Sequence, residues 1–146
     1  MVRIVERGRR RRPLFSISED ALVSCIMPTR NRRKHVPRAI GFFLAQTYRN
    51  RELIIVDDGS DSVRDLIPID PRIRYIRSEQ AKPVGAKRNF SCLHANGTLI
   101  AHWDDDDWIA PSRLDSQVSA LLQTQADVCG IDRIYYLEPC SRRAWT

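Results

Sequence analysis

The chain has 146 residues, of which 42% are hydrophobic and 29% are charged. This length and composition are typical of one globular domain that is large enough to fold around its own hydrophobic core. No apolar run approaches the ~20 residues that cross a membrane, which excludes a transmembrane span over this sequence.

The formal net charge of +6 is concentrated at the N-terminus. Residues 1–13 hold six arginines and one glutamate, a charge of +5, so the rest of the chain is nearly neutral. We therefore predict a basic, disordered tail over residues 1–20, a single domain over residues 21–146, and no specific nucleic-acid partner. A weak contact of the tail with a polyanion or a membrane surface remains an alternative.

The four cysteines, Cys25, Cys92, Cys129 and Cys140, form no CxxC pair, which disfavours a zinc site or a thioredoxin-type motif. Cys25 lies in an apolar run and Cys92 on an apolar helical stripe, and both positions are typical of free buried thiols. No apolar segment follows the N-terminal arginines, so we expect no signal peptide. Together these features favour a reducing, cytoplasmic location.

The first predicted strand is Leu22–Met27, a short apolar run that Pro28 is expected to end. A helix is predicted from Val36, with Pro37 in its first turn. Its expected core-facing residues, at helical spacing, are Val36, Ile40, Phe43 and Leu44. The second predicted strand, Glu52–Asp57, has an apolar interior and ends in the turn-forming residues 57–60.

A third, shorter strand is predicted over Ile73–Ile76, and a second helix over Pro83–His94. The fourth predicted strand, Thr98–Trp103, runs directly into four aspartates, after which Pro111 opens a third helix. The residues expected to face the core are Ala86, Phe90 and Leu93 in the second helix and Leu114, Val118, Leu121 and Leu122 in the third. One or two further strands are expected within Asp127–Leu137.

Strands that are apolar throughout and that alternate with helices predict an α/β fold, in which a mostly parallel sheet has helices on both faces. In such sheets the ligand site lies at the carboxyl ends of the strands. Three polar segments follow predicted strands in this sequence: residues 28–31, 57–60 and 104–107. We expect the functional site to be built from these segments.

The segment Asp104–Asp107 carries the most chemical information, because four adjacent carboxylates repel one another unless they share a cation. If strand alternation continues past Trp103, Asp104 and Asp106 point to the same side. Oxygen ligands of this kind suit Mg²⁺ or Mn²⁺, which keep coordination positions open for substrate phosphates. His102 shares their parity and is interpreted as a packing residue. The alternative is a solvated acidic turn at the start of the third helix.

The segment Asp57–Ser60 places carboxylates where a nucleobase or a ribose hydroxyl can bind, although Ser60 and Asp61 would equally cap a helix. Glycine-rich phosphate loops are absent from the sequence, which disfavours a dinucleotide-dependent dehydrogenase or a P-loop enzyme. No serine, cysteine or histidine stands in a setting typical of a nucleophile.

Four segments, taken in order, resemble the nucleotide-binding half of a family 2 glycosyltransferase with the GT-A fold. They are VSCIMPTRNRRKHVPRAIGFFLAQTY, ELIIVDDGSD, GAKRN and GTLIAHWDDDDWIAPSRL, which lie between Val23 and Leu122. The resemblance implies an inverting enzyme that transfers a sugar from a nucleotide-diphospho-sugar, usually UDP-linked, to an acceptor, with Mn²⁺ or Mg²⁺ bridging the diphosphate. The chain is short for this family, so we expect a shortened GT-A domain without most of the acceptor half.

The resemblance also implies roles for individual residues. Those corresponding to nucleotide-binding positions are Pro28, Thr29, Arg30, Asp57, Asp58, Lys87, Arg88, Asn89, Asp104 and Asp105. Within this set Asp58 faces the base, and the cations of Lys87 and Arg88 lie near the diphosphate. The DxD motif corresponds to Asp104 and Asp106, with Asp106 on the metal and Asp104 beside it. Asp105 and Asp107 remain open as the alternative register.

The family's general base lies further downstream than the last acids of this chain, so we assign none. The acids that follow the DxD motif are Asp115, Asp127, Asp132 and Glu138. Two other functions remain open: a non-catalytic module that binds a nucleotide sugar, and a sugar nucleotidyltransferase. The second is disfavoured because residues 28–33 contain no glycine. An apolar edge left exposed by a shortened fold would favour a homodimer.

Overall fold

The computed structural model describes residues 17–131, 136–138 and 143–145. The chain divides into two compact units, and residues 20–114 form the first of them. The described part of the second comprises residues 17–19, 115–131, 136–138 and 143–145. No helix among these described residues is long and apolar enough to cross a membrane.

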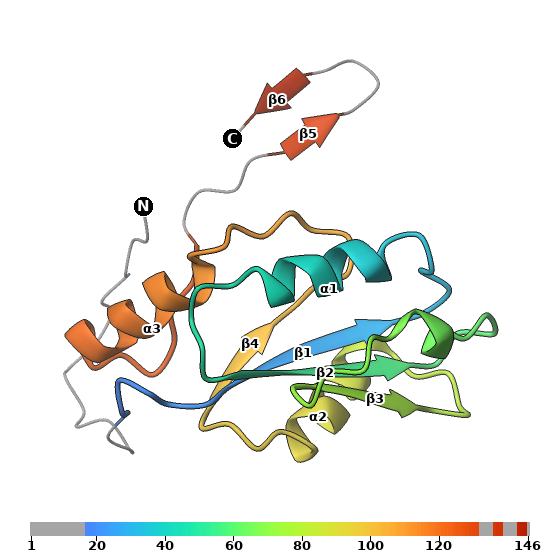
Figure 1. The fold of residues 1–146 in the computed structure, drawn as a ribbon, viewed down its shortest axis with the longest axis horizontal. Coiled ribbons are helices and arrows are strands. Elements are labelled where there is room, and N and C mark those ends of the chain that lie inside the picture. Colours follow the sequence, from blue (N-terminus) through green and yellow to red (C-terminus); the bar gives the residue numbers. More distant parts are fainter. Residues whose placement is uncertain (1–16, 132–135, 139–142, 146) are drawn as a thin grey trace. The chain divides into compact units, whose positions relative to one another are not determined.

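A parallel sheet of four strands runs through the first unit in the order β3-β2-β1-β4 (Figure 1). The strands are β1 (Val23–Thr29), β2 (Arg51–Asp57), β3 (Ile73–Arg77) and β4 (Leu99–His102). All three pairings are parallel, with Val23 of β1 opposite Arg51 of β2 and Leu99 of β4. The carboxyl ends of all four strands therefore meet at one edge of the sheet.

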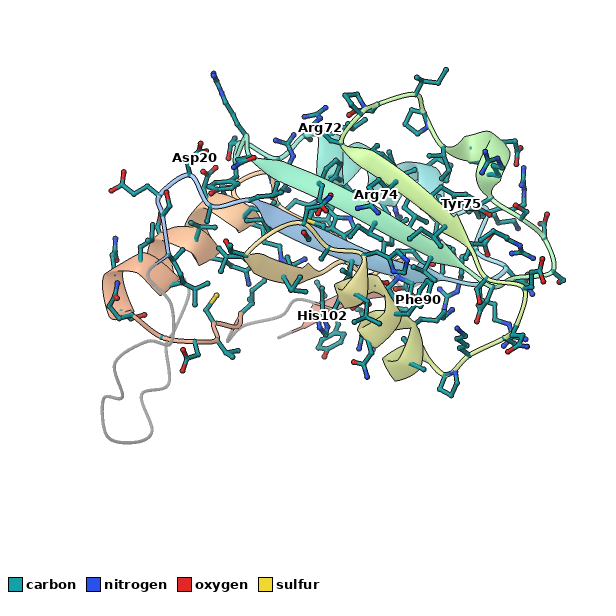
Figure 2. The ribbon with its side chains drawn as sticks, turned by 90° about the horizontal axis from the view of Figure 1, so that it is seen from below. Asp20, Arg72, Arg74, Tyr75, Phe90 and His102 are labelled. Carbon is teal, nitrogen blue, oxygen red and sulfur yellow. The ribbon has the colours of Figure 1, made fainter. Side chains whose placement is uncertain are left out.

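The two helices of the first unit are α1 (Val36–Leu44) and α2 (Val84–Leu93), and they lie on opposite faces of the sheet (Figures 1 and 2). A short 3-10 helix, η1 (Arg64–Leu66), follows β2. The predicted α/β fold with helices on both faces of a parallel sheet is thus confirmed. Helix α3 (Arg113–Thr124) begins at the end of the first unit, and the second unit also holds the antiparallel strands β5 (Tyr136–Glu138) and β6 (Arg143–Trp145).

Trp103 fixes α1 to the sheet. Its side chain is fully buried, its indole N–H donates a hydrogen bond of 3.1 Å to the carbonyl oxygen of Ala39, and its ring meets Phe43 edge-on at 6.1 Å. Phe43 is also fully buried and lies under the guanidinium of Arg51 at 5.2 Å. The residue directly before the four aspartates is therefore part of the core, and the acidic segment starts from a rigid anchor.

The first strand does not end at Pro28, as the sequence predicted, but continues through Thr29. Successive residues of a parallel strand turn their backbone groups to alternate neighbours. Ile26 accepts a hydrogen bond from the backbone of Trp103 on the β4 side, and Pro28 faces the same side. Pairing with β4 ends at Ile26, so the missing N–H of Pro28 interrupts no hydrogen bond of the sheet.

The predicted buried face of α2 is wrong. Of its three residues Ala86 is exposed, Leu93 is 83% exposed and Phe90 is half-buried, whereas Lys87 and Ser91 are buried. The prediction relied on the spacing of apolar residues, but the side of α2 that faces the sheet holds Lys87, whose ammonium contacts Asp58 and Thr29 at the sheet edge. Cys92 is exposed rather than buried for the same reason.

Other predictions on burial had mixed outcomes. Cys25 is fully buried as expected, and burial raises the pKa of its thiol to about 12. Leu44 was predicted to face the core, but it is 38% exposed, because the buried face of α1 runs through Val36, Ala39, Ile40 and Phe43. On α3, three of the four predicted residues, Leu114, Val118 and Leu121, are buried, and Leu122 is half-buried.

Some predictions fall partly on residues that are not described. Residues 1–16, most of the predicted tail, lie outside the described residues, as do residues 132–135 of the segment expected to hold the last strands. The described part of that segment includes the start of β5 at Tyr136.

The burial of Trp103 leads to a prediction about the free energy of unfolding, and Trp108 in the same segment provides a matched control. We expect Trp103→Ala to lower the free energy of unfolding by about 3–5 kcal/mol, because it empties a large core site. Trp108→Ala should cost about 1 kcal/mol or less, since Trp108 is 74% exposed and its ring meets the ring of Phe42 edge-on at 6.5 Å. Urea unfolding of both variants measures the difference, and equal losses would contradict the assigned core.

Candidate active site at the carboxyl edge of the sheet

An open pocket with a volume of about 240 Å³ lies at the carboxyl edge of the sheet. It brings together the end of β1, the start of α2 and the acidic segment that follows β4. The residues that line it are Pro28, Arg30, Arg32, Val84, Lys87, Asp104, Asp105 and Asp106. Two of the three segments predicted to build the site, 28–31 and 104–107, contribute to this lining, and no residue of the third, 57–60, lines the pocket. Charged side chains dominate the lining.

Asp58 and Lys87 form a buried ion pair at the base of this pocket. The Nζ of Lys87 lies 2.8 Å from Oδ1 of Asp58 and donates a second hydrogen bond of 3.0 Å to the carbonyl oxygen of Thr29. The other oxygen of Asp58 accepts a hydrogen bond from the backbone N–H of Lys82. Burial raises the pKa of Asp58, but the hydrogen bonds from Lys87 and Lys82 outweigh this effect and hold the pKa below its usual value.

Asp57 is fully buried and organises the loop that follows β2. Its carboxylate accepts hydrogen bonds from the backbone N–H groups of Gly59 (2.8 Å) and Val63 (3.1 Å) and from the hydroxyl of Tyr75 (2.8 Å). Arg77 lies 3.2 Å from the same carboxylate. Figure 2 shows Tyr75 on β3, the strand next to β2. The carboxylate oxygens of Asp57 are thus bound to groups of the protein itself, and Asp57 orders the loop but does not line the pocket.

The loop 57–63 is also tied to the loop after β1. The side-chain oxygen of Asn31 accepts hydrogen bonds from Ser60 and from the backbone of Asp61, and Asn31 itself has a positive φ of 55°. The guanidinium of Arg33 makes two hydrogen bonds to Asp65, at 2.7 and 2.6 Å. These contacts hold the two loops at the sheet edge as one unit.

Burial alternates from Asp104 to Asp106 and then stops, because Asp106 and Asp107 are both exposed. Asp105 is buried and accepts a hydrogen bond of 2.6 Å from the hydroxyl of Thr29, whereas the side chains of Asp104 and Asp106 are 43% and 47% exposed. Asp104 pairs with Arg88 at 2.8 Å, and Asp106 pairs with Arg32 at 2.7 Å. Each carboxylate of the predicted DxD motif thus has its own cationic partner.

Asp107 differs from its three neighbours because it lies outside the pocket lining. Partial burial raises its pKa, and the charges of Asp104 and Asp106 raise it further. The pKa of Asp106, in contrast, is lowered by the hydrogen bond from Arg32. Asp104, Asp105 and Asp106 therefore line the pocket, and Asp107 does not.

Arg32 and Arg38 are functional candidates that the sequence analysis did not single out. Arg32 lines the pocket, and Arg38 on α1 donates a hydrogen bond of 3.2 Å to the backbone oxygen of Asp106. The available signal was the run of basic residues after the first strand. Conversely, neither Asn89 on α2 nor His102 at the end of β4 is among the residues that line the pocket. His102 was interpreted as a packing residue, but its side chain is exposed (Figure 2).

The donor chemistry of the acidic segment suits a hard divalent cation. Asp104 and Asp106 offer carboxylate oxygens that are half exposed beside a pocket open to solvent. Among the described residues no group of three or more acidic, histidine or cysteine side chains is arranged to hold a metal. Mg²⁺ and Mn²⁺ are compatible with such a site, because they can take one or two protein carboxylates and complete their coordination with phosphates and water.

A family model for glycosyl transferase family 2 matches residues 24–146. The chain belongs to this family. Among curated relatives, the Escherichia coli protein named UDP-Glc:alpha-D-GlcNAc-diphosphoundecaprenol beta-1,3-glucosyltransferase WfgD is 39% identical over 72% of this chain. An uncharacterized glycosyltransferase of Haemophilus influenzae is 34% identical over 70%. Each match covers 43% of the relative's own length.

Two solved structures share the fold. The mannosyltransferase PcManGT from Pyrobaculum calidifontis, solved with GDP-Man and Mn²⁺, matches 68% of this chain and 32% of its own with a TM-score of 0.63 and 21% identity. S. aureus TarS 1-349 in complex with UDP matches 72% of this chain and 33% of its own, with a TM-score of 0.63 and 22% identity. The chain thus spans about a third of the length of these two proteins, and over the matched part it shares their fold, as the resemblance predicted.

The buried pair of Asp58 and Lys87 makes a prediction about stability and pH. We expect Asp58→Asn to cost about 3–5 kcal/mol at pH 7, because it leaves the ammonium of Lys87 buried without an opposite charge. The folded-state pKa of Asp58 is lowered, so its ionisation stabilises the fold above the unfolded pKa of about 3.9, and this contribution is lost as the pH falls through the folded value.

Urea unfolding between pH 7 and pH 3 measures both effects. The variant should lose less of its remaining stability on acidification than the wild type. Asp107→Asn is the control, since Asp107 is exposed and forms no ion pair with any described residue. An unchanged stability of Asp58→Asn at pH 7 would contradict the pair.

Proposed function

We propose that this chain is the nucleotide-sugar-binding part of a glycosyltransferase that uses a divalent cation and, most simply, a UDP-linked donor. The observation that carries the proposal is the pocket at the carboxyl edge, where half-exposed carboxylates and arginines line one open space. A nucleoside diphosphate with a bound cation presents the complementary charges. The names of the relatives support this class of substrate, since they refer to UDP-Glc, GDP-Man and UDP.

The basic side chains of the pocket are proposed to bind the diphosphate. Arg30 lies exposed at the end of β1, and Lys87 reaches the pocket from α2. The Nε of Arg88 is buried and has no hydrogen-bond partner within the described part of the chain, although its Nη2 contacts Asp104. An anionic ligand next to Asp104 would satisfy this donor. Pro28 lines the pocket beside these basic side chains, whereas Thr29 is buried and reaches the site only through its hydrogen bond to Asp105. Asn89 remains a proposed contact from the exposed side of α2.

The acidic side chains divide the remaining roles. We assign the cation to Asp106, with Asp104 beside it and near the ribose, and Asp105 supports both through its bond to Thr29. When bound, Mg²⁺ or Mn²⁺ would neutralise the charge that develops on the departing diphosphate. Asp58 is proposed to face the nucleobase of the donor while it orients Lys87. Asp57 is proposed to hold the loop that forms one side of the nucleobase site.

Binding experiments test the assignment of the cation. We expect UDP to bind the wild type more tightly in the presence of Mn²⁺, and Asp106→Ala to abolish this metal-dependent gain while leaving the fold intact, because the side chain is half exposed. Isothermal calorimetry with and without Mn²⁺ provides the measurement. Asp107→Ala removes a neighbouring carboxylate outside the pocket and should keep the gain.

The outcomes separate the candidate functions. Retained metal-dependent affinity in Asp106→Ala would assign the metal to another carboxylate. Metal-dependent binding of UDP without hydrolysis or transfer of a UDP-sugar would indicate a non-catalytic binding module. Absence of any UDP binding by the wild type would contradict both.

A further inference from the structure

We propose that Arg32 is an internal competitor of the divalent cation: its guanidinium neutralises Asp105 and Asp106 until the cation binds and displaces it. The inference rests on the proposed function, because it concerns the carboxylate assigned to the metal. It adds a residue and a regulatory step that the assignment of the metal site does not contain.

The geometry of Arg32 carries the inference. Its Nη1 lies 2.7 Å from Oδ2 of Asp106 and 3.8 Å from Oδ1 of Asp105. A single cationic nitrogen therefore serves two adjacent carboxylates, one oxygen from each. A divalent cation bound to Oδ2 of Asp106 would need the space that this nitrogen occupies, so the two cations are mutually exclusive at that oxygen.

The surroundings decide which group can move. Asp105 is held by the hydrogen bond from Thr29, and its side chain is only 8% exposed. The backbone of Asp106 is held separately by Arg38 at 3.2 Å. The Arg32 side chain is 45% exposed and has room to rotate into solvent. Displacement therefore needs a change in one side chain and no movement of the acidic segment.

The energetics favour the exchange. Ion pairs between exposed side chains contribute little to stability, so releasing Arg32 from a half-exposed partner costs little. The buried pair of Lys87 and Asp58, with side chains 6% and 0% exposed, has no such freedom. Arg32 and Arg30 line the same pocket, so a diphosphate bound there would offer the released side chain a new anionic partner. Cation and nucleotide should then each favour binding of the other.

Titration of the full chain with Mn²⁺ in the absence of nucleotide, followed by the electron paramagnetic resonance signal of free Mn²⁺, tests the proposal. Arg32→Gln should bind Mn²⁺ about two- to five-fold more tightly than the wild type, the range expected for loss of one exposed ion pair. Arg32→Lys keeps a cation at this position and should stay close to the wild type. Arg30→Gln is the matched control: it removes the same charge from the same pocket, and no ion pair joins Arg30 to Asp105 or Asp106.

The results have distinct meanings. A gain in Arg32→Gln that clearly exceeds the gain in Arg30→Gln supports displacement. Equal gains would reduce the effect to the overall charge of the pocket and overturn the proposal, as would unchanged or weaker binding in Arg32→Gln. Failure of every variant and of the wild type to bind Mn²⁺, with or without UDP, would contradict the proposed function itself.

Discussion

The concentration of negative charge at one edge of the sheet is the constraint on which the rest of this structure depends. Six aspartates lie at the ends of β2 and β4, and the parallel topology brings those ends together. Uncompensated carboxylates at such distances would destabilise the fold. Basic side chains from α2, β3 and the loop after β1 form ion pairs with these aspartates and compensate their charge.

These compensating contacts differ in burial, and the difference separates structural from functional roles. Lys87 with Asp58, and Arg77 with the fully buried Asp57, hold the base of the site and the loop beside it. Arg88 with Asp104 and Arg32 with Asp106 lie at the half-exposed surface of the pocket. Buried pairs of this kind are costly to break, whereas exposed pairs exchange readily. The buried ion pairs therefore keep the bottom of the site fixed, whereas the half-exposed ion pairs at its surface can exchange partners.

The order of strands and helices could be predicted from the sequence because apolar runs and helical spacing report burial directly. The acidic segment could also be predicted from the sequence, because Asp104–Asp107 directly follows an apolar run that was predicted as a strand. The face of α2 could not be predicted, since Lys87 is buried by its contact with Asp58, 29 residues away in the sequence. Spacing rules treat lysine as a surface residue, and only the three-dimensional arrangement reveals its partner. The contact of Arg32 with Asp106 could not be predicted, because nothing in a run of basic residues indicates which of them pairs with a carboxylate.

Paramagnetic relaxation provides the most direct measurement of the central claim, that a divalent cation and a nucleoside diphosphate meet at this edge of the sheet. Mn²⁺ added with UDP to the isotopically labelled chain should broaden the backbone amide resonances of residues 104–106 most strongly, followed by those of residues 29–32. Amides at the opposite ends of the strands, such as Val23 and Arg51, should broaden least. Broadening centred away from the acidic segment, or none at saturating UDP and Mn²⁺, would contradict the account.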